Sequence, residues 1–179
     1  MPEQAWPPHR PRPWPTGLRY PAVARYHFLT TWLLDVPRER VWSQLKDPLS
    51  WPEWWRGVVR VEEHDPGDEQ GRGGRHTVVW RSRIPYPLEF QFQTDEVDAP
   101  RRMAGRAFGE LEGTGIWRLW EDGEVTAVLY EWDVRTTKPW MNALAPLAGP
   151  AFRWNHDVVM RHGGEGLARR LGARLLAHG

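Results

Sequence analysis

The stretch DVPRERVWSQLKDPLSWPEWWRGV, residues 35–58, decides the fold. Pro37 suits the first turn of a helix, and residues 38–46 continue that turn as a short helix. Pro48 and Pro52 follow, so a second short helix is expected after a tight break. The stretch therefore predicts two short helices in succession, between segments whose patterns are different.

The same stretch is rich in tryptophan, which occupies positions 42, 51, 54 and 55. Positions 51, 54 and 55 share one face of the second helix because they lie three and four residues apart. The whole chain holds 13 Trp, against 4 Tyr and 5 Phe. Pockets for small molecules are mostly apolar and aromatic, so we interpret the cluster as closing one end of a hollow fold. The alternative is that these rings seal a small solid core.

Composition excludes several classes of protein. A chain of 179 residues suits one domain with its own core, and 24 Lys and Arg against 23 Asp and Glu indicate neither nucleic acid nor an anionic membrane as partner. The absence of cysteine excludes disulfides, thiolate metal sites and a cysteine nucleophile. No apolar run is long enough to cross a bilayer, and no secretory signal is recognised. We expect a cytoplasmic protein without membrane insertion, and its oligomeric state stays open.

The first part of the chain differs from the rest. Residues 1–22 are rich in proline, which favours extended polyproline conformations. We expect a tail that is loose or lies along the domain, with a docking peptide as the alternative. Residues 23–179 are expected to form one ligand-binding domain.

The remaining chain up to residue 137 has the pattern of β-strands separated by turns. Strands are expected at residues 25–36, 58–65, 75–83, 87–97, 101–108, 113–120 and 124–137. Apolar and polar residues alternate within them, so one face of an antiparallel sheet is polar and carries Glu131 and Asp133. The side chains expected on the opposite, inner face are Leu88, Phe90, Phe92, Trp117, Tyr130 and Trp132.

After residue 137 the pattern becomes helical. One stripe at helical spacing contains Phe152, His156, Val159, Met160, Gly163 and Leu167. Pro146 and Pro150 are expected to kink or interrupt the first part, and HGGEG, residues 162–166, to weaken the middle. We therefore expect a long C-terminal helix, broken or unbroken, that continues to the end and lies across the sheet with His156 directed toward it.

This order of elements predicts an α+β fold in which a curved antiparallel sheet wraps around a long C-terminal helix, with two short helices after the first strand. The blocks DVPRERVWSQLKDPLSWPEWW, GTGIWRLW, VLYEWDV and FRWNHDVVMRHGGEGLARRL resemble the SRPBCC, or START-like, superfamily. These helix-grip proteins include birch-pollen-allergen-like and polyketide cyclase/dehydrase-like proteins. The resemblance runs from residue 25 to about residue 174 and implies an internal cavity, which the two short helices close at one end. It does not specify a ligand.

Several kinds of catalytic site lack support. The seven histidines show no paired metal-ligand spacing, and no HExxH motif occurs, so no metal or other cofactor is expected. No serine lies in a GxSxG elbow. The GRGG stretch at residues 71–74 precedes a strand rather than a helix, so we interpret it as a turn and not as a phosphate-binding loop. The predicted outward direction of Glu131 and Asp133 favours solvated charges, although a register slip of one residue would turn both inward.

The candidate site is the predicted interior. The residues expected to contact a ligand are Trp54, His76, Trp80, Phe90, Phe92, Trp117, Tyr130, Trp132, His156 and Met160. Binding of a hydrophobic small molecule, aromatic or lipid-like, is the leading hypothesis. The alternative is a polyketide cyclase or dehydratase in which His156 transfers a proton, and a third, weaker hypothesis is a partner-binding module that uses the same groove.

Overall fold

The computed structural model describes residues 24–81 and 86–179, with the backbone alone for residues 144–148. Eight strands form one curved sheet in the order β2-β3-β4-β5-β6-β7-β1-β8, and each neighbouring pair is antiparallel. The strands are β1 (Arg25–Leu34), β2 (Val58–Asp65), β3 (Arg75–Trp80), β4 (Leu88–Asp98), β5 (Arg102–Gly109), β6 (Leu111–Asp122), β7 (Val125–Thr136) and β8 (Leu175–His178). The predicted antiparallel meander is confirmed. The proline-rich tail expected over residues 1–22 lies outside the described residues.

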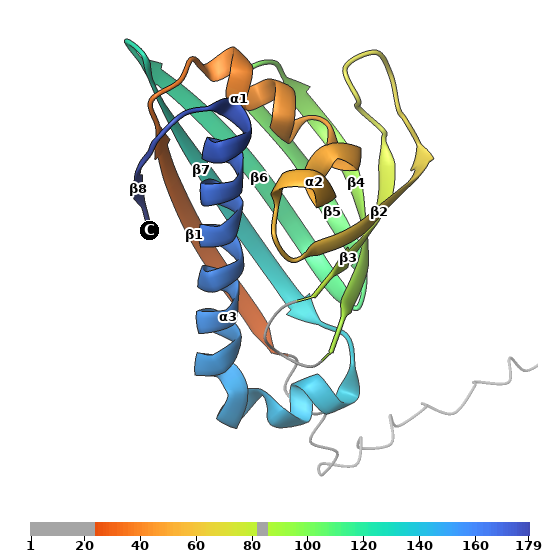
Figure 1. Ribbon diagram of the computed structural model, residues 1–179. Helices are drawn as coiled ribbons and strands as arrows, with labels where there is room; N and C mark the ends of the chain where they lie inside the picture. The colour runs from red at the N-terminus through yellow and green to blue at the C-terminus, as the bar shows by residue number, and fades with distance from the viewer. Residues whose placement is uncertain (1–23, 82–85) are drawn as a thin grey trace, which may run out of the picture.

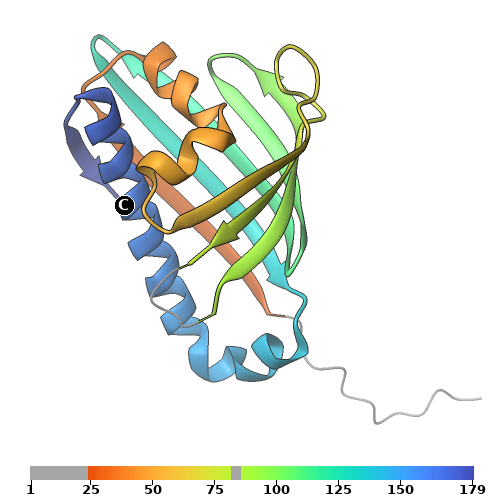
Figure 2. The same cartoon turned by 45° about the vertical axis from the view of Figure 1, so that its right-hand side comes forward.

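The helices lie on the concave face of this sheet. They are α1 (Arg38–Leu45), the 3-10 turn η1 (Pro48–Ser50), α2 (Trp51–Trp54) and α3 (Pro139–Leu171). Figure 1 shows α1 and α2 over one end of the sheet, while α3 runs along its concave face; the rotated view in Figure 2 shows the sheet curving around α3. The α+β helix-grip fold predicted from the sequence is confirmed.

Helix α3 is bent, as its prolines predict. Its first part lies across the end of the sheet opposite α1, and the chain then turns to run along the sheet (Figure 1). Pro150 has no N–H to continue the helical ladder, and its ring crowds the carbonyl group of residue 146. The bend leaves residues 151–171 facing the sheet.

The glycines of α3 do not interrupt the helix, contrary to the expected weakening over residues 162–166. They lie where α3 contacts the tryptophan-rich stretch. A Cβ atom on Gly163 would lie 2.5 Å from the Trp55 ring, and one on Gly166 would lie 1.8 Å from the Trp54 carbonyl oxygen. Glycine is therefore needed for the close approach of α2 and α3, and packing compensates for its poor helix propensity.

The prediction that the helix continues to the end of the chain is wrong. Gly172 adopts a left-handed conformation (φ 62°, ψ 30°) and ends α3, while the Ala173 N–H donates to the Ala168 carbonyl oxygen at 2.9 Å. Strand β8 then pairs with β1, and the N–H of Thr31 donates to the Gly179 carbonyl oxygen at 2.6 Å. The C-terminus thus extends the sheet beyond β1.

The convex face of the sheet is polar, as the alternation predicts. Glu131 forms an ion pair with Arg118, and Asp133 accepts a hydrogen bond from Arg25 at 3.1 Å. Across residues 24–81 and 86–179, no helix has the length and apolar character needed to span a membrane.

Candidate ligand-binding cavity

The tryptophan-rich stretch forms a packed cluster at the α2 end of the interior. Trp55 is 1% exposed, and its ring centroid lies 5.2–6.2 Å from those of five other tryptophans. Its Nε1–H donates to the Val159 carbonyl oxygen of α3 at 3.0 Å. These five neighbours are Trp32, Trp51, Trp54, Trp80 and Trp117. The cluster is a dense core that bounds the hollow part of the fold at this end.

A cavity of about 130 Å3 lies between the sheet and α3, next to this cluster. The described residues of its wall are Tyr26, Phe28, Trp80, Leu88, Phe90, Leu111, Tyr130, Trp132, Val134, Thr136, Met141, Phe152, Asn155, His156, Val159 and Met160. An engineered apolar cavity of about 150 Å3 holds benzene, so this cavity has room for about one aromatic ring. Beyond it lies a recess of about 30 Å3 that shares Trp80, Phe90, Tyr130 and Trp132 with the cavity.

The structure brings most of the predicted site residues together. Those that line the cavity are Trp80, Phe90, Tyr130, Trp132, His156 and Met160, and those that line only the recess are Phe92 and Trp117. Trp54 and His76 line neither space. Trp54 is buried against α3, and its Nε1–H donates to Ser50 Oγ of η1 at 3.3 Å.

His76 is buried on the inner face of β3, where its Nε2 lies 3.4 Å from Glu63 Oε2. Burial lowers the pKa of His76, and the hydrogen bond and charge of Glu63 oppose that shift. The residue occupies the predicted face of the strand, but at a point beyond the cavity.

Strand β1 contributes two wall residues that the sequence analysis did not include, Tyr26 and Phe28. Both lie on the same face of the strand as Trp32, which is buried. The alternation within residues 25–34 carries this signal, because every second side chain of a strand points to one side. From α3, Met141, Phe152 and Asn155 were also missed as wall residues.

His156 is held against β1. Its ring stacks on that of Phe28, with centroids 3.9 Å apart and an interplanar angle of 14°, and its Nε2 lies 3.4 Å from Thr30 Oγ1. Burial lowers the pKa of His156 from 6.5 to about 4, because the charged form loses its hydration. At neutral pH the imidazole is uncharged, with one donor and one acceptor nitrogen.

Besides the Trp80 Nε1–H, which is buried close to Gly57 without a partner, the cavity wall holds further polar groups that have no hydrogen-bond partner among the described residues. One is the Tyr130 hydroxyl group, whose pKa is strongly raised by burial, so it remains protonated. Tyr130 is half-buried and faces Gly115, where a Cβ atom would lie 2.9 Å from the hydroxyl oxygen. Another is Asn155 Oδ1, which is buried without a partner.

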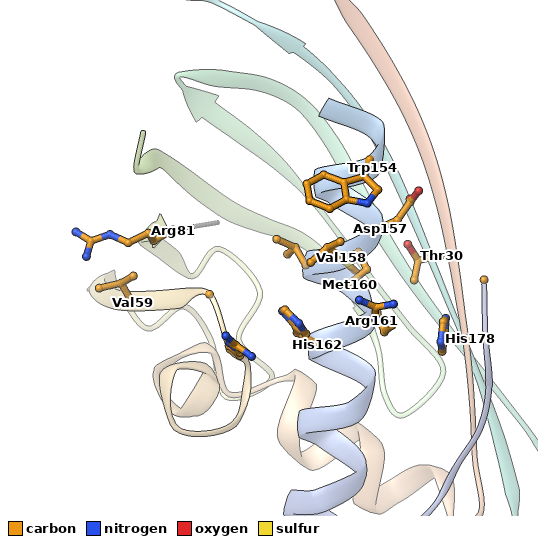
Figure 3. A pocket seen from close by; sticks show the side chains of 14 residues that line it. Thr30, Val59, Arg81, Trp154, Asp157, Val158, Met160, Arg161, His162 and His178 are labelled. Atoms are coloured by element: carbon orange, nitrogen blue, oxygen red, sulfur yellow. The ribbon is translucent and has the colours of Figure 1, made fainter. Parts of the chain in front are cut away.

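A separate groove of about 850 Å3 lies on the outer side of α3. Figure 3 shows the helix between Val59 and Arg81 on one side and Thr30 and His178 on the other. Charged side chains line this groove, namely Arg56, Arg81, Asp157 and Arg161. Val159 and Met160 contribute to both spaces, so α3 separates a charged exterior from the aromatic interior. Within the described part of the chain, no three His, Asp or Glu side chains are grouped to hold a metal ion.

Solved structures with the same fold include enzymes and a START protein. The di-domain ARO/CYC protein BexL of the BE-7585A biosynthetic pathway is 16% identical, with 84% of this chain and 51% of BexL covered and a TM-score of 0.65. This chain thus spans about half the length of BexL. The Zhui aromatase/cyclase of Streptomyces sp. R1128 is 21% identical, with 83% and 93% of the two chains covered and a TM-score of 0.62. A START superfamily protein of Mycobacterium smegmatis is 12% identical, with 82% and 97% covered and a TM-score of 0.67.

These identities establish a shared fold and leave each activity with the protein that carries it. No curated protein sequence gives a significant match. A protein family matches over residues 27–177, and its description is "Polyketide cyclase / dehydrase and lipid transport". Because the match spans most of the chain, the protein belongs to this polyketide cyclase/dehydrase and lipid transport family.

Proposed function

We propose that this protein binds a small hydrophobic molecule, aromatic or lipid-like, in the cavity between the sheet and α3. The cavity itself carries the proposal. Protein interiors rarely leave voids larger than a water molecule, yet about 130 Å3 is open here between aromatic and aliphatic side chains. A few polar groups, among them His156 and Asn155, interrupt the apolar wall, which is the usual composition of a small-molecule site. The family description, with its lipid transport, supports the same role.

A polyketide cyclase or dehydratase activity is the second candidate, and His156 is the observation that favours it. A neutral imidazole in the cavity wall can accept and return a proton. Its pKa of about 4, however, makes it a weak base at neutral pH, where a general base works best with a pKa near the operating pH. None of the described wall residues is a carboxylate that would complete an acid–base pair. Binding therefore has the stronger support.

The experiment that tests the proposal fills the cavity. Val134 is 2% exposed and lines the cavity, so Val134→Phe should occupy the space that a ligand needs. Isothermal titration with 2-naphthol should show saturable binding to the wild type and at least about tenfold weaker binding to the variant, the effect of losing about 1.4 kcal/mol. Val59→Phe is the matched control, because Val59 is 50% exposed on β2. Equal binding to all three proteins would place the site outside the cavity.

Native mass spectrometry then separates the two candidates. A compound that co-purifies with the protein is weighed in the complex and again after release and incubation with fresh protein. A carrier returns the compound with an unchanged mass. A dehydratase or dehydrating cyclase returns it lighter by one water molecule, and His156→Phe should abolish that change.

A further inference from the structure

We infer that the cavity selects an uncharged molecule with a hydroxyl group on an aromatic ring, and that Asn155 and Tyr130 determine this selection. The inference rests on the proposed function and adds the chemical class of the ligand. Three observations carry it: the charges of the wall, the polar groups of Tyr130 and Asn155, which lack partners, and the size of the cavity.

The wall of the cavity offers no partner for a charge. None of its described residues is Lys, Arg, Asp or Glu. His156 is neutral because of its low pKa, and Tyr130 keeps its proton. Arg153 influences the Tyr26 hydroxyl group but does not belong to the wall. A carboxylate ligand would lose its hydration on entering and gain no ion pair, which is costly in an apolar site.

Asn155 lacks the hydrogen bonds that the other asparagine of α3 makes. Asn142 Oδ1 accepts hydrogen bonds from the Ala24 N–H at 3.0 Å and from the Thr136 hydroxyl group at 2.7 Å. Asn155 Oδ1 is buried in the cavity wall with no partner. A buried acceptor without a partner costs free energy, so Asn142 has a structural role that Asn155 does not share. A ligand O–H group that donates to Asn155 Oδ1 would remove that cost.

Tyr130 adds a second polar contact to the same wall. Its protonated hydroxyl group has no partner in the described part of the chain, so it can donate to an oxygen atom of the ligand. The Tyr130 ring also stacks on Trp117 at 4.0 Å and on Trp132 at 5.8 Å, which fixes the direction of the hydroxyl group. The ligand class is therefore a hydroxylated ring held between aromatic walls.

The size of the cavity limits the ring system. About 130 Å3 accepts one ring, and the adjoining recess of about 30 Å3 is where a second fused ring would extend. A phenol or naphthol fits this description, whereas a long-chain fatty acid exceeds it in size and carries the wrong charge.

Three probes of matched shape test the inference by isothermal titration at pH 7.5: 2-naphthol, 2-naphthoate and naphthalene. We expect 2-naphthol to bind about 100-fold more tightly than 2-naphthoate, because the carboxylate enters without a partner. We expect it to bind about tenfold more tightly than naphthalene, because of the hydrogen bonds to its hydroxyl group. Equal or tighter binding of 2-naphthoate would overturn the inference while leaving the proposed function intact. If none of the three binds, the proposed binding of aromatic molecules fails as well.

Two variants test whether Asn155 and Tyr130 cause the preference for a hydroxylated ring. Asn155→Leu should reduce the tenfold preference for 2-naphthol over naphthalene to about threefold, since one of the two hydrogen bonds is lost, and leave the melting temperature unchanged or higher, since it removes an unpartnered polar atom. Tyr130→Phe should reduce the same preference without changing the shape of the wall. The control Asn142→Leu should lower the melting temperature, because it removes two hydrogen bonds, and leave the preference unchanged, because Asn142 does not line the cavity. An unchanged preference in both Asn155→Leu and Tyr130→Phe would remove these residues from the site.

Discussion

The two ends of the interior are both built from aromatic side chains, but one end is tightly packed and the other contains a cavity. At the α2 end, Trp55 contacts other tryptophan rings on several sides, Gly163 and Gly166 let α3 approach closely, and the recess lined by Trp55 measures only about 30 Å3. At the other end, Phe28 and Trp132 also face α3, but about 130 Å3 stays open. Aromatic content alone therefore does not predict a cavity. Glycines on the facing helix mark the solid end.

Polar groups without partners occur at both ends, and their surroundings differ. Trp32 Nε1 is buried without a partner at the solid end, where a Cβ atom on Gly164 would lie 3.0 Å away from it. Asn155 Oδ1 is buried without a partner beside the cavity. A lone indole N–H in tight packing is a cost of dense packing, whereas a lone amide oxygen beside open space can bind a ligand.

The largest loss of stability is expected when a tryptophan is removed from the tightly packed α2 end. Trp55→Ala removes a ring that is 1% exposed and its hydrogen bond to Val159, so the free energy of unfolding should fall by about 3–5 kcal/mol. The matched variant at the hollow end, Phe28→Ala, should cost clearly less, because the half-buried Phe28 already borders open space. Urea unfolding measures both. Similar losses would mean that the two ends are packed alike.

A smaller loss of stability is expected when a side chain is added at the contact between α2 and α3. A Cβ atom on Gly166 would overlap the Trp54 carbonyl oxygen, which is backbone and cannot rotate away. Gly166→Ala should therefore destabilise the protein by about 3 kcal/mol, the upper part of the usual range for overpacking. Gly149 lies in the same helix with no described atom within 4 Å of its Cβ position, so Gly149→Ala should stabilise by about 0.5–1 kcal/mol. If both variants are stabilising, α2 and α3 separate at little cost.

The smallest effect concerns the hollow end and depends on pH. The pKa of His156 is about 4 in the folded protein and 6.5 when exposed, so below pH 6.5 the unfolded state binds a proton that the folded state does not. Stability is thus unaffected above pH 6.5 and falls as the pH decreases toward 4. At pH 5 the loss amounts to about 2 kcal/mol, from 1.36 kcal/mol per pKa unit.

His156→Phe isolates this contribution from the other groups that titrate in the same range. The pKa of His76 is also lowered by burial, so it acts in the same direction in both proteins. Urea unfolding at pH 7 and pH 5 should show a loss that is smaller by about 2 kcal/mol in the variant than in the wild type. Identical losses would show that His156 is protonated in the folded protein and is not shielded by the cavity.

The sequence predicted the faces of the strands better than positions along them. Alternation correctly placed Trp80, Phe90 and Tyr130 on the inner side, because the period of a strand is two residues. It also placed His76 on that side, but periodicity says nothing about how far along the strand the cavity extends, and His76 lies beyond it. The helical stripe placed His156 against the sheet for a similar reason.

Other features depend on contacts that no local pattern shows. Residues 175–178 read as a continuation of the apolar helix, although Gly172 after Arg169 and Arg170 is a typical end signal. The HGGEG stretch reads as a weak helix until the approach of α2 is known. Whether an asparagine is satisfied, as Asn142 is and Asn155 is not, follows from the tertiary structure alone.

The hydrogen bond from Trp55 to the Val159 carbonyl group anchors α3 at the point where the cavity begins. Moving the helix along its axis by one residue is a shift of about 1.5 Å, enough to break a bond of 3.0 Å. Sliding of α3 along its axis therefore costs this hydrogen bond. Under the proposed function, we expect a bulkier ligand to be accommodated by side-chain rotamers on the sheet and by the part of α3 before Pro150.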